Sequence, residues 1–151
     1  MAVVTPQHAD DVIRRVLAER RTWAVVGCSP DPGRDSNRIA RLLKSRGYRV
    51  IPVNPEADEI LGERCYPSLR DVPREAGVEV VDIFRRSEAA GGHVDEAIEA
   101  GAQAVWMQLG VIDEPAAARA REAGLDVVMD RCPAIELPRL RIDGPTEVPG
   151  R

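Results

Sequence analysis

The sequence predicts an α/β protein of the Rossmann-like type, a three-layer fold with a five-stranded parallel sheet and helices on both faces. Five short apolar segments alternate with helical patterns, which is typical of a parallel sheet covered on both sides. The chain has 151 residues, 44% hydrophobic and 30% charged, which suits one globular domain with one core. Since right-handed crossovers leave few topologies, we expect the strand order 3-2-1-4-5.

The expected strands are runs of successive apolar residues rather than alternating ones. This pattern indicates strands that are buried on both faces of a sheet. A proline inside the second run, Pro52, weakens the prediction there, because proline cannot donate to a strand ladder. The five runs are 23–26, 48–53, 79–84, 104–107 and 126–129.

The segments between these runs carry apolar residues three and four positions apart, as amphipathic helices do. The first expected helix, 10–20, precedes the first strand, and the second is capped by Asp35 or Ser36 and ends at Gly47. The remaining helical segments are 69–72, 87–101 and 114–123, and residues 54–67 are expected to form a long loop. We expect one domain over residues 1–140, including the first helix, and a flexible tail over 141–151, which contains proline and glycine.

Charge and cysteine usage exclude several classes of protein. A net charge of -4 argues against general nucleic-acid binding, which requires a basic face. No apolar run approaches the roughly 20 residues of a membrane span, and no secretory signal pattern opens the chain. The three cysteines form no closely spaced pair, which fits a cytoplasmic protein, and the isolated His8 and His93 make a metal site unexpected.

In such sheets, ligands bind at the carboxyl ends of the strands. The residues that follow each expected strand are therefore the candidate binding residues, and four arginines are among them. They are Gly27, Cys28, Ser29, Arg34, Ser36 and Asn37 after the first strand, Asn54 and Pro55 after the second, Arg85 and Arg86 after the third, Gln108 and Gly110 after the fourth, and Arg131 after the fifth.

The loop after the first strand is the strongest single signal. A glycine, a loop and a capped helix present free backbone N–H groups at a helix N-terminus, where a phosphate fits. The spacing from Gly27 to Gly33 is longer than the G-x-G-x-x-G turn of dinucleotide-binding proteins. By itself, the loop is compatible with phosphate binding and with an ordinary strand–helix connection.

The other strand ends leave alternatives open. NAD-binding domains usually place an acid at the end of the second strand, where this chain has Asn54–Pro55. The pair Arg85–Arg86 is either a solvated surface pair or an anion site, and cations at a helix N-terminus favour the anion. Cys28 and Cys132 are either small buried side chains or reactive thiols. We find no catalytic constellation in the sequence.

Six segments in order resemble the small bacterial and archaeal CoA-binding proteins, single-domain relatives of the CoA-binding domain in the succinyl-CoA synthetase alpha subunit. The resemblance covers residues 22–137 and is specific because several motifs occur at the right spacings. They are Val25-Val-Gly-Cys-Ser29, Val50-Ile-Pro-Val-Asn-Pro55, Ile60-Leu-Gly62, Asp82-Ile-Phe-Arg-Arg86, Val105-Trp-Met-Gln-Leu-Gly110 and Met129-Asp-Arg-Cys-Pro133.

The resemblance implies a Rossmann-like fold that binds coenzyme A (CoA) at the strand ends. It places Gly27, Ser29 and Ser36 at the CoA phosphates, Val53, Asn54 and Pro55 along the nucleotide, Phe84 and Arg85 after the third strand, and Gln108 and Gly110 towards the pantetheine. The chain departs from the synthetase pattern in carrying Glu56-Ala57-Asp58 where a lysine follows the proline. The synthetase's histidine domain is also absent, so its chemistry does not carry over.

We therefore expect a non-catalytic module that binds CoA or an acyl-CoA as a sensor or carrier. The first alternative is an enzyme that uses NAD(P) or another adenine nucleotide. The second is a subunit that completes a site with a partner protein or a second copy. The expected partner is a small-molecule nucleotide ligand, together with a possible protein partner or homo-oligomer, and neither nucleic acid nor a membrane is expected.

Overall fold

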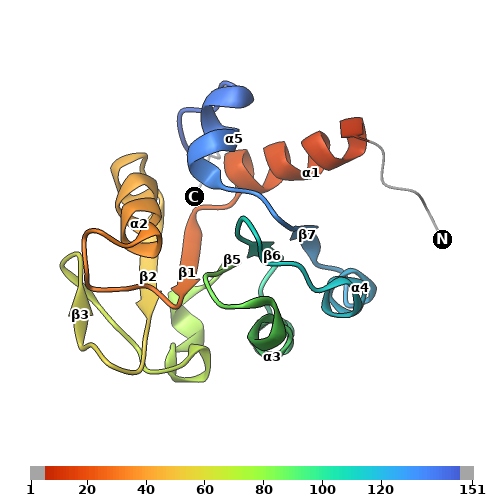
Figure 1. The fold of residues 1–151 in the computed structure, drawn as a ribbon. Helices are drawn as coiled ribbons and strands as arrows, with labels where there is room; N and C mark the ends of the chain where they lie inside the picture. Colours follow the sequence, from red (N-terminus) through yellow and green to blue (C-terminus); the bar gives the residue numbers. More distant parts are fainter. Residues whose placement is uncertain (1–5, 147–151) are drawn as a thin grey trace.

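The structure is a computed structural model, and it describes residues 6–146. Five parallel strands form its main sheet, and each lies within or beside a segment predicted to be a strand (Figure 1). They are β1 (Thr22–Val26), β2 (Arg49–Val53), β5 (Val80–Ile83), β6 (Ala104–Met107) and β7 (Asp126–Val128). The predicted α/β architecture is therefore confirmed.

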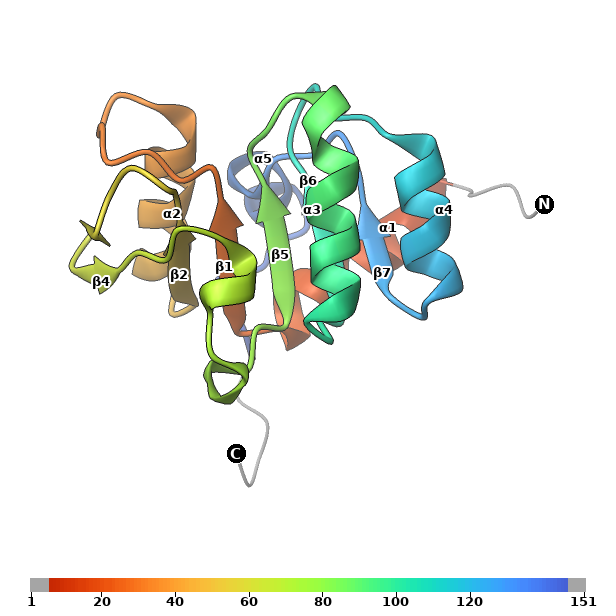
Figure 2. The same cartoon turned by 90° about the horizontal axis from the view of Figure 1, so that it is seen from below.

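Helices cover both faces of the sheet, as predicted. One face packs against α1 (Pro6–Glu19), α2 (Asp35–Ser45) and α5 (Pro133–Arg139), and the other packs against α3 (Ser87–Glu99) and α4 (Glu114–Glu122) (Figures 1 and 2). Two short 3-10 turns, η1 (Leu69–Asp71) and η2 (Arg74–Ala76), precede β5. Helix α5 was not predicted, although its first residue is a proline, a favoured residue at that position.

The strand order is β2-β1-β5-β6-β7. A single residue, Tyr66, adds a parallel bridge to Val53 on the outer side of β2, with hydrogen bonds from Tyr66 N to Pro52 O (3.1 Å) and from Asn54 N to Tyr66 O (2.9 Å). If the Tyr66 bridge is counted as the third strand along the chain, β5, β6 and β7 become the fourth, fifth and sixth. The order from the outer edge is then the predicted 3-2-1-4-5, followed by the sixth strand.

The prediction of which segment fills the third position was wrong. Residues 79–84 were expected to fill it, whereas β5 pairs with β1 on the side away from β2. The physical reason lies in the expected loop 54–67, which contains the hairpin β3 (Glu59–Ile60) and β4 (Glu63–Arg64) and then reaches β2 at Tyr66. Because that edge is already occupied, β5 takes the free edge of β1.

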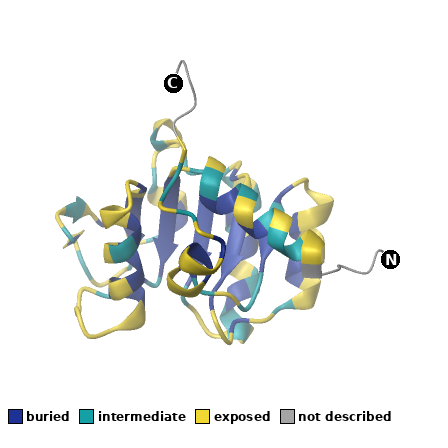
Figure 3. Ribbon diagram, turned by 90° about the horizontal axis from the view of Figure 1, so that it is seen from above, coloured by how far each residue is buried: buried dark blue, intermediate teal, exposed yellow. Residues whose placement is uncertain are grey.

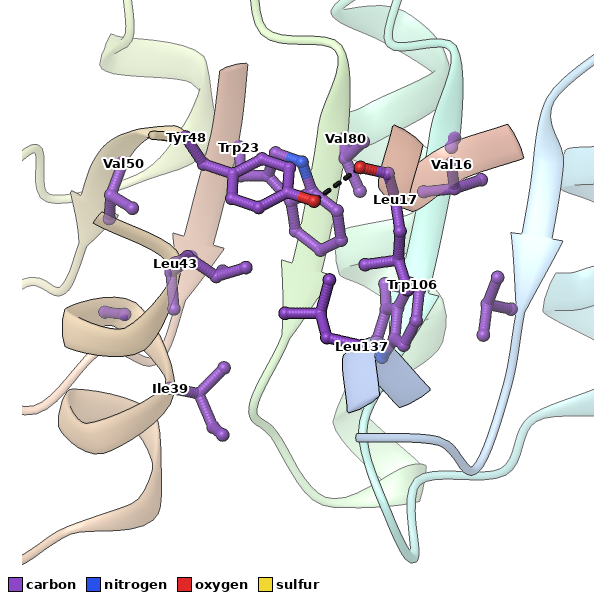
Figure 4. Packing of buried hydrophobic residues seen from close by; sticks show 14 of the residues in the cluster. Val16, Leu17, Trp23, Ile39, Leu43, Tyr48, Val50, Val80, Trp106 and Leu137 are labelled. Atoms are coloured by element: carbon purple, nitrogen blue, oxygen red, sulfur yellow. Dashed lines mark hydrogen bonds between the residues drawn. The ribbon is translucent and has the colours of Figure 1, made fainter. Parts of the chain in front are cut away.

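Aromatic residues form the centre of the core on the α1, α2 and α5 face (Figure 4). The ring centroid of Trp23 lies 5.6 Å from that of Tyr48, with the two rings edge to face, and 5.5 Å from that of Trp106. The Tyr48 hydroxyl donates to the carbonyl of Leu17 in α1, which satisfies a polar group that burial would otherwise destabilise. Aromatic residues make up only 3% of the chain, and these three lie where the sheet meets three helices.

The central strands are buried between the two helical layers, and the exposed residues lie on the outer sides of the helices and in the loops (Figure 3). Over residues 6–146, no helix is both long enough and apolar enough to cross a bilayer. The first part of the expected tail contacts the domain: Thr146 N donates to Ala18 O (2.7 Å) and Ile142 N to Leu137 O (2.9 Å). The rest of the tail lies outside the described residues.

Candidate functional site

Two adjoining pockets lie at the carboxyl ends of β2, β1 and β5. The first, which we call the strand-end pocket, has a volume of about 350 Å³. The second, the loop pocket, has a volume of about 480 Å³ and lies against the loop that enters α2. Gly27 and Phe84 line both, so the two pockets form one continuous surface.

Gly27 allows three strand ends to meet at this point. Its backbone φ is +83°, and a Cβ atom added there would lie 2.5 Å from the carbonyl oxygen of Phe84. Its N–H donates to the carbonyl of Val53 at 2.9 Å. Only glycine combines this conformation with such a close approach, so the residue fixes the geometry of both pockets.

The loop after β1 is held by its own serine side chains. Ser36 Oγ accepts a hydrogen bond from Ser29 N (2.9 Å), and Ser29 Oγ accepts one from Asp31 N (3.1 Å). Asn37, which is almost completely buried, donates from Nδ2 to Ser29 O (2.9 Å). These contacts fold the loop over the start of α2.

The N-terminus of α2 opens into the loop pocket. The expected cap by Asp35 or Ser36 was wrong: among residues 6–146 no side chain caps this helix end, whose N-cap residue is Arg34, and Asp35 and Ser36 lie in the first turn and line the pocket. The first N–H groups of a helix have no partners within the helix. These N–H groups are therefore available to an anion, which keeps open the phosphate-binding interpretation of this loop.

Two arginines contribute positive charge to the pockets. Arg34 lines the loop pocket and Arg85 the strand-end pocket. Within residues 6–146, neither guanidinium forms a hydrogen bond or an ion pair. Arg86 is the N-cap residue of α3 and lines neither pocket, so the structure separates the two members of the predicted pair.

The side chain of Asn54 stabilises the site through two hydrogen bonds. Its Nδ2 donates to Cys28 O (2.8 Å), and its Oδ1 accepts from Glu56 N (2.8 Å). The amide therefore ties the end of β2 to the end of β1. Pro55 and Glu56 line the strand-end pocket directly, and Glu56 places a carboxylate there.

Four of the predicted site residues have other surroundings. Cys28 is fully buried in the core, and burial raises the pKa of its thiol to about 12, so it is no thiolate at neutral pH. Gln108 is buried and donates to Asp82. Gly110 N donates to Asp130 Oδ1 (2.8 Å), and Arg131 lies beside Glu136 with its Nε 3.6 Å from a carboxylate oxygen.

Asp82 was not predicted as a site residue, although an acid inside an apolar strand was a visible signal. Its side chain is fully buried in β5, and Gln108 Nε2 donates to its Oδ1 at 2.6 Å. Its Oδ2 has no hydrogen-bond partner within residues 6–146. Burial raises the pKa of this carboxyl to about 8, and the hydrogen bond from Gln108 opposes that shift.

The strand-end pocket also has a wall that sequence reasoning missed. It comes from the segment before η1 and from α3, and its residues are Pro67, Ser68, Leu69 and His93. No motif marks these positions, because the course of residues 54–67 depends on the Tyr66 bridge. His93 Nδ1 lies 2.9 Å from Glu96 Oε1, and the described residues contain no cluster of His, Cys, Asp and Glu that could hold a metal ion.

Comparisons with known proteins agree on one relationship. The family described as the CoA binding domain matches residues 21–138. The uncharacterized protein YneT of Bacillus subtilis is 37% identical over 120 residues, which cover 80% of this chain and 87% of that protein. A hypothetical protein from Pyrococcus horikoshii has a solved structure with a TM-score of 0.81 and 42% identity, covering 87% of this chain and 92% of that one.

Longer enzymes contain a similar domain. The ADP-forming acetate–CoA ligase II of Archaeoglobus fulgidus is 39% identical over 71 residues, which are 46% of this chain and only 10% of that enzyme. A dinucleotide-forming acetyl-coenzyme A synthetase from Ca. Korarchaeum cryptofilum has a TM-score of 0.65 and 30% identity, and the match covers 78% of this chain and 27% of that one. The chain thus corresponds to a small part of each enzyme.

Proposed function

The chain belongs to the CoA-binding domain family, and from this premise we propose that it binds CoA or an acyl-CoA in the two pockets, as a cytoplasmic sensor or carrier that catalyses no reaction itself. The observation that supports this most is the meeting of an uncapped helix N-terminus with two unpaired arginines around Gly27. CoA carries several phosphate charges, and these groups supply what a phosphate requires.

In the proposed arrangement, the loop pocket holds the phosphates. Backbone N–H groups at the start of α2 and the hydroxyls of Ser29 and Ser36 face them, and Arg34 supplies positive charge. Each serine Oγ already accepts an amide hydrogen bond, and its own proton is free to point towards a ligand.

The strand-end pocket would hold the nucleotide. Its walls combine apolar groups, including Leu69 and Phe84, with the backbone that follows Val53 and with Arg85. A mostly apolar lining with a few fixed polar groups is typical of small-molecule sites. The pantetheine would extend along the strand ends towards Gly110, as the resemblance implies.

The proposal includes the statement that the chain catalyses no reaction. The Cys28 thiol lies in the core and is protonated at neutral pH, so it is not available as a nucleophile. His93 and Ser68 both line the strand-end pocket, but the Ser68 hydroxyl donates to Asp71 at 2.8 Å and His93 Nδ1 lies against Glu96, so this imidazole does not activate the serine.

One observation favours the alternative of a nicotinamide nucleotide. Glu56 lines the strand-end pocket two residues after Asn54, and a carboxylate near the end of the second strand is the group that holds ribose hydroxyls in NAD sites. CoA remains the leading proposal because the family and the arginines support it together.

Thermal denaturation in the presence of CoA, NAD or NADP tests the choice. A ligand that binds only the folded state raises the free energy of unfolding, by about 2.7 kcal/mol at 100-fold excess over Kd. We expect millimolar CoA to raise Tm by several degrees and NAD to leave it unchanged. A shift with NAD or NADP and none with CoA would refute the proposal.

A further inference from the structure

A second concave surface lies at the opposite edge of the sheet from β2, between α1 and α4. This groove has a volume of about 810 Å³, and Leu125, Val127 and Met129 contribute apolar surface to it. Figure 1 shows β7 between the two helices, with β6 as its neighbour in the sheet. The groove is separate from the two proposed ligand pockets, with which it shares no lining residue.

One wall of the groove is a face of α4 with an unusual distribution of charge. Glu114, Ala118 and Arg121 line it, and all three are exposed. Over residues 6–146, neither Glu114 nor Arg121 forms an ion pair or a side-chain hydrogen bond. Arg119 of the same helix, by contrast, is bound to Asp95 of α3 at 2.9 Å. The unpaired charges thus lie on the groove side of α4, whereas the paired Arg119 lies towards α3.

We propose that this face of α4 binds a second copy of the chain, so that two α4 helices cross in antiparallel orientation at Ala118. In this dimer, Glu114 of each chain pairs with Arg121 of the other. The inference does not depend on the proposed binding of CoA.

Helix geometry makes the face complementary to itself. Along the axis, Glu114 lies about 6 Å before Ala118 and Arg121 about 4.5 Å after it. Each residue turns the helix by about 100°. Viewed along the helix axis, Glu114 and Arg121 are therefore rotated away from Ala118 to the same side, by about 40° and about 60°. A two-fold axis perpendicular to both helices keeps that side and reverses the direction along the axis, so it brings each glutamate opposite an arginine.

The remaining features of the face fit a close crossing. Ala118 is small, so two helices can approach to the short end of the usual 8–10 Å interaxial range at that residue. The two-fold relation makes the interface isologous, with each ion pair occurring twice. A different protein would need its own matching pattern, whereas a second copy provides the pattern by symmetry.

Charge reversal tests the proposal by sedimentation equilibrium. At about 0.1 mM, where an interface of modest size is populated, we expect the wild type to form dimers. Glu114→Arg and Arg121→Glu each convert both ion pairs into like-charge contacts and should raise the dimer Kd by more than about tenfold. The double variant restores opposite charges and should form dimers again. Glu75→Arg, at an exposed glutamate that lies outside the groove, is the control.

The double variant also separates the interface from helix stability. It places an arginine in the first turn of α4 and a glutamate in the last, which the helix dipole disfavours. Recovery of the dimer therefore cannot come from a more stable helix, and circular dichroism checks that each variant is folded. A monomeric wild type, dimers that withstand the single reversals, or a double variant that stays monomeric would each overturn the proposal.

Discussion

Replacing Asp82 by asparagine should stabilise the protein at neutral pH. The carboxyl is fully buried, its pKa is raised from 3.8 to about 8, and its one hydrogen bond comes from Gln108. Asparagine has the same shape, keeps an oxygen to accept from Gln108, and never ionises. The substitution therefore removes an ionisable group and leaves the packing unchanged.

The size of the effect follows from the two pKa values. In the unfolded chain the carboxyl ionises near pH 3.8, whereas in the folded chain it holds its proton to about pH 8. Between these values the unfolded state binds fewer protons, so the free energy of unfolding decreases as pH rises. One pH unit corresponds to 1.36 kcal/mol, and at pH 7 the loss reaches about 4 kcal/mol, an upper limit for the gain in Asp82→Asn.

Urea denaturation of both proteins at several pH values measures this difference. We expect Asp82→Asn to exceed the wild type by a few kcal/mol at pH 7–8 and to approach it near pH 4. Asp58→Asn, which changes an exposed side chain, is the control. Its free energy of unfolding should equal that of the wild type at every pH. The reasoning fails if the wild type and Asp82→Asn show parallel pH profiles, or if the variant is less stable at every pH.

Three further substitutions test the pocket geometry. Gly27→Ala should strongly destabilise the fold or abolish CoA binding, because its Cβ would lie 2.5 Å from Phe84 O, and a variant with wild-type Tm and affinity would contradict this. Arg85→Ala should weaken CoA binding about tenfold and reduce its salt dependence, while Arg86→Ala, the matched control outside both pockets, should not; equal calorimetric affinities for the two variants would contradict this. Ser36→Glu should weaken CoA binding, because its carboxylate repels a phosphate, and should also lower Tm, because Ser36 is buried and its Oγ accepts from Ser29 N; unchanged affinity in a titration would show that no phosphate binds there.

The sequence predicted the fold well because its main signals are local. Apolar runs of four to six residues, with glycines such as Gly47 and Gly124 between helix and strand, are sufficient to locate five strands. The position of residues 79–84 could not be predicted in the same way. It depends on the single-residue bridge at Tyr66, a tertiary contact with no sequence pattern of its own.

The residues of the candidate site also differ in whether local sequence or tertiary contacts determine their positions. Residues within two positions of a strand end, such as Gly27, Pro55 and Arg85, were predicted as candidates and line the strand-end pocket, because topology brings the strand ends to one edge. The sequence could not show which member of Arg85–Arg86 lines a pocket, because this depends on where α3 begins. The wall around Leu69 and His93 was missed because it comes from segments that do not follow a strand end.

The most direct test of the central claim is the change in backbone amide NMR signals as CoA is added to the protein. The account predicts the largest shifts in residues 27–37, 53–56 and 84–85, which surround the two pockets, and small shifts in α1 and α4. Saturable shifts confined to those segments would support CoA binding at the carboxyl edge of the sheet. An unchanged spectrum at millimolar CoA, or shifts centred on the groove between α1 and α4, would contradict it.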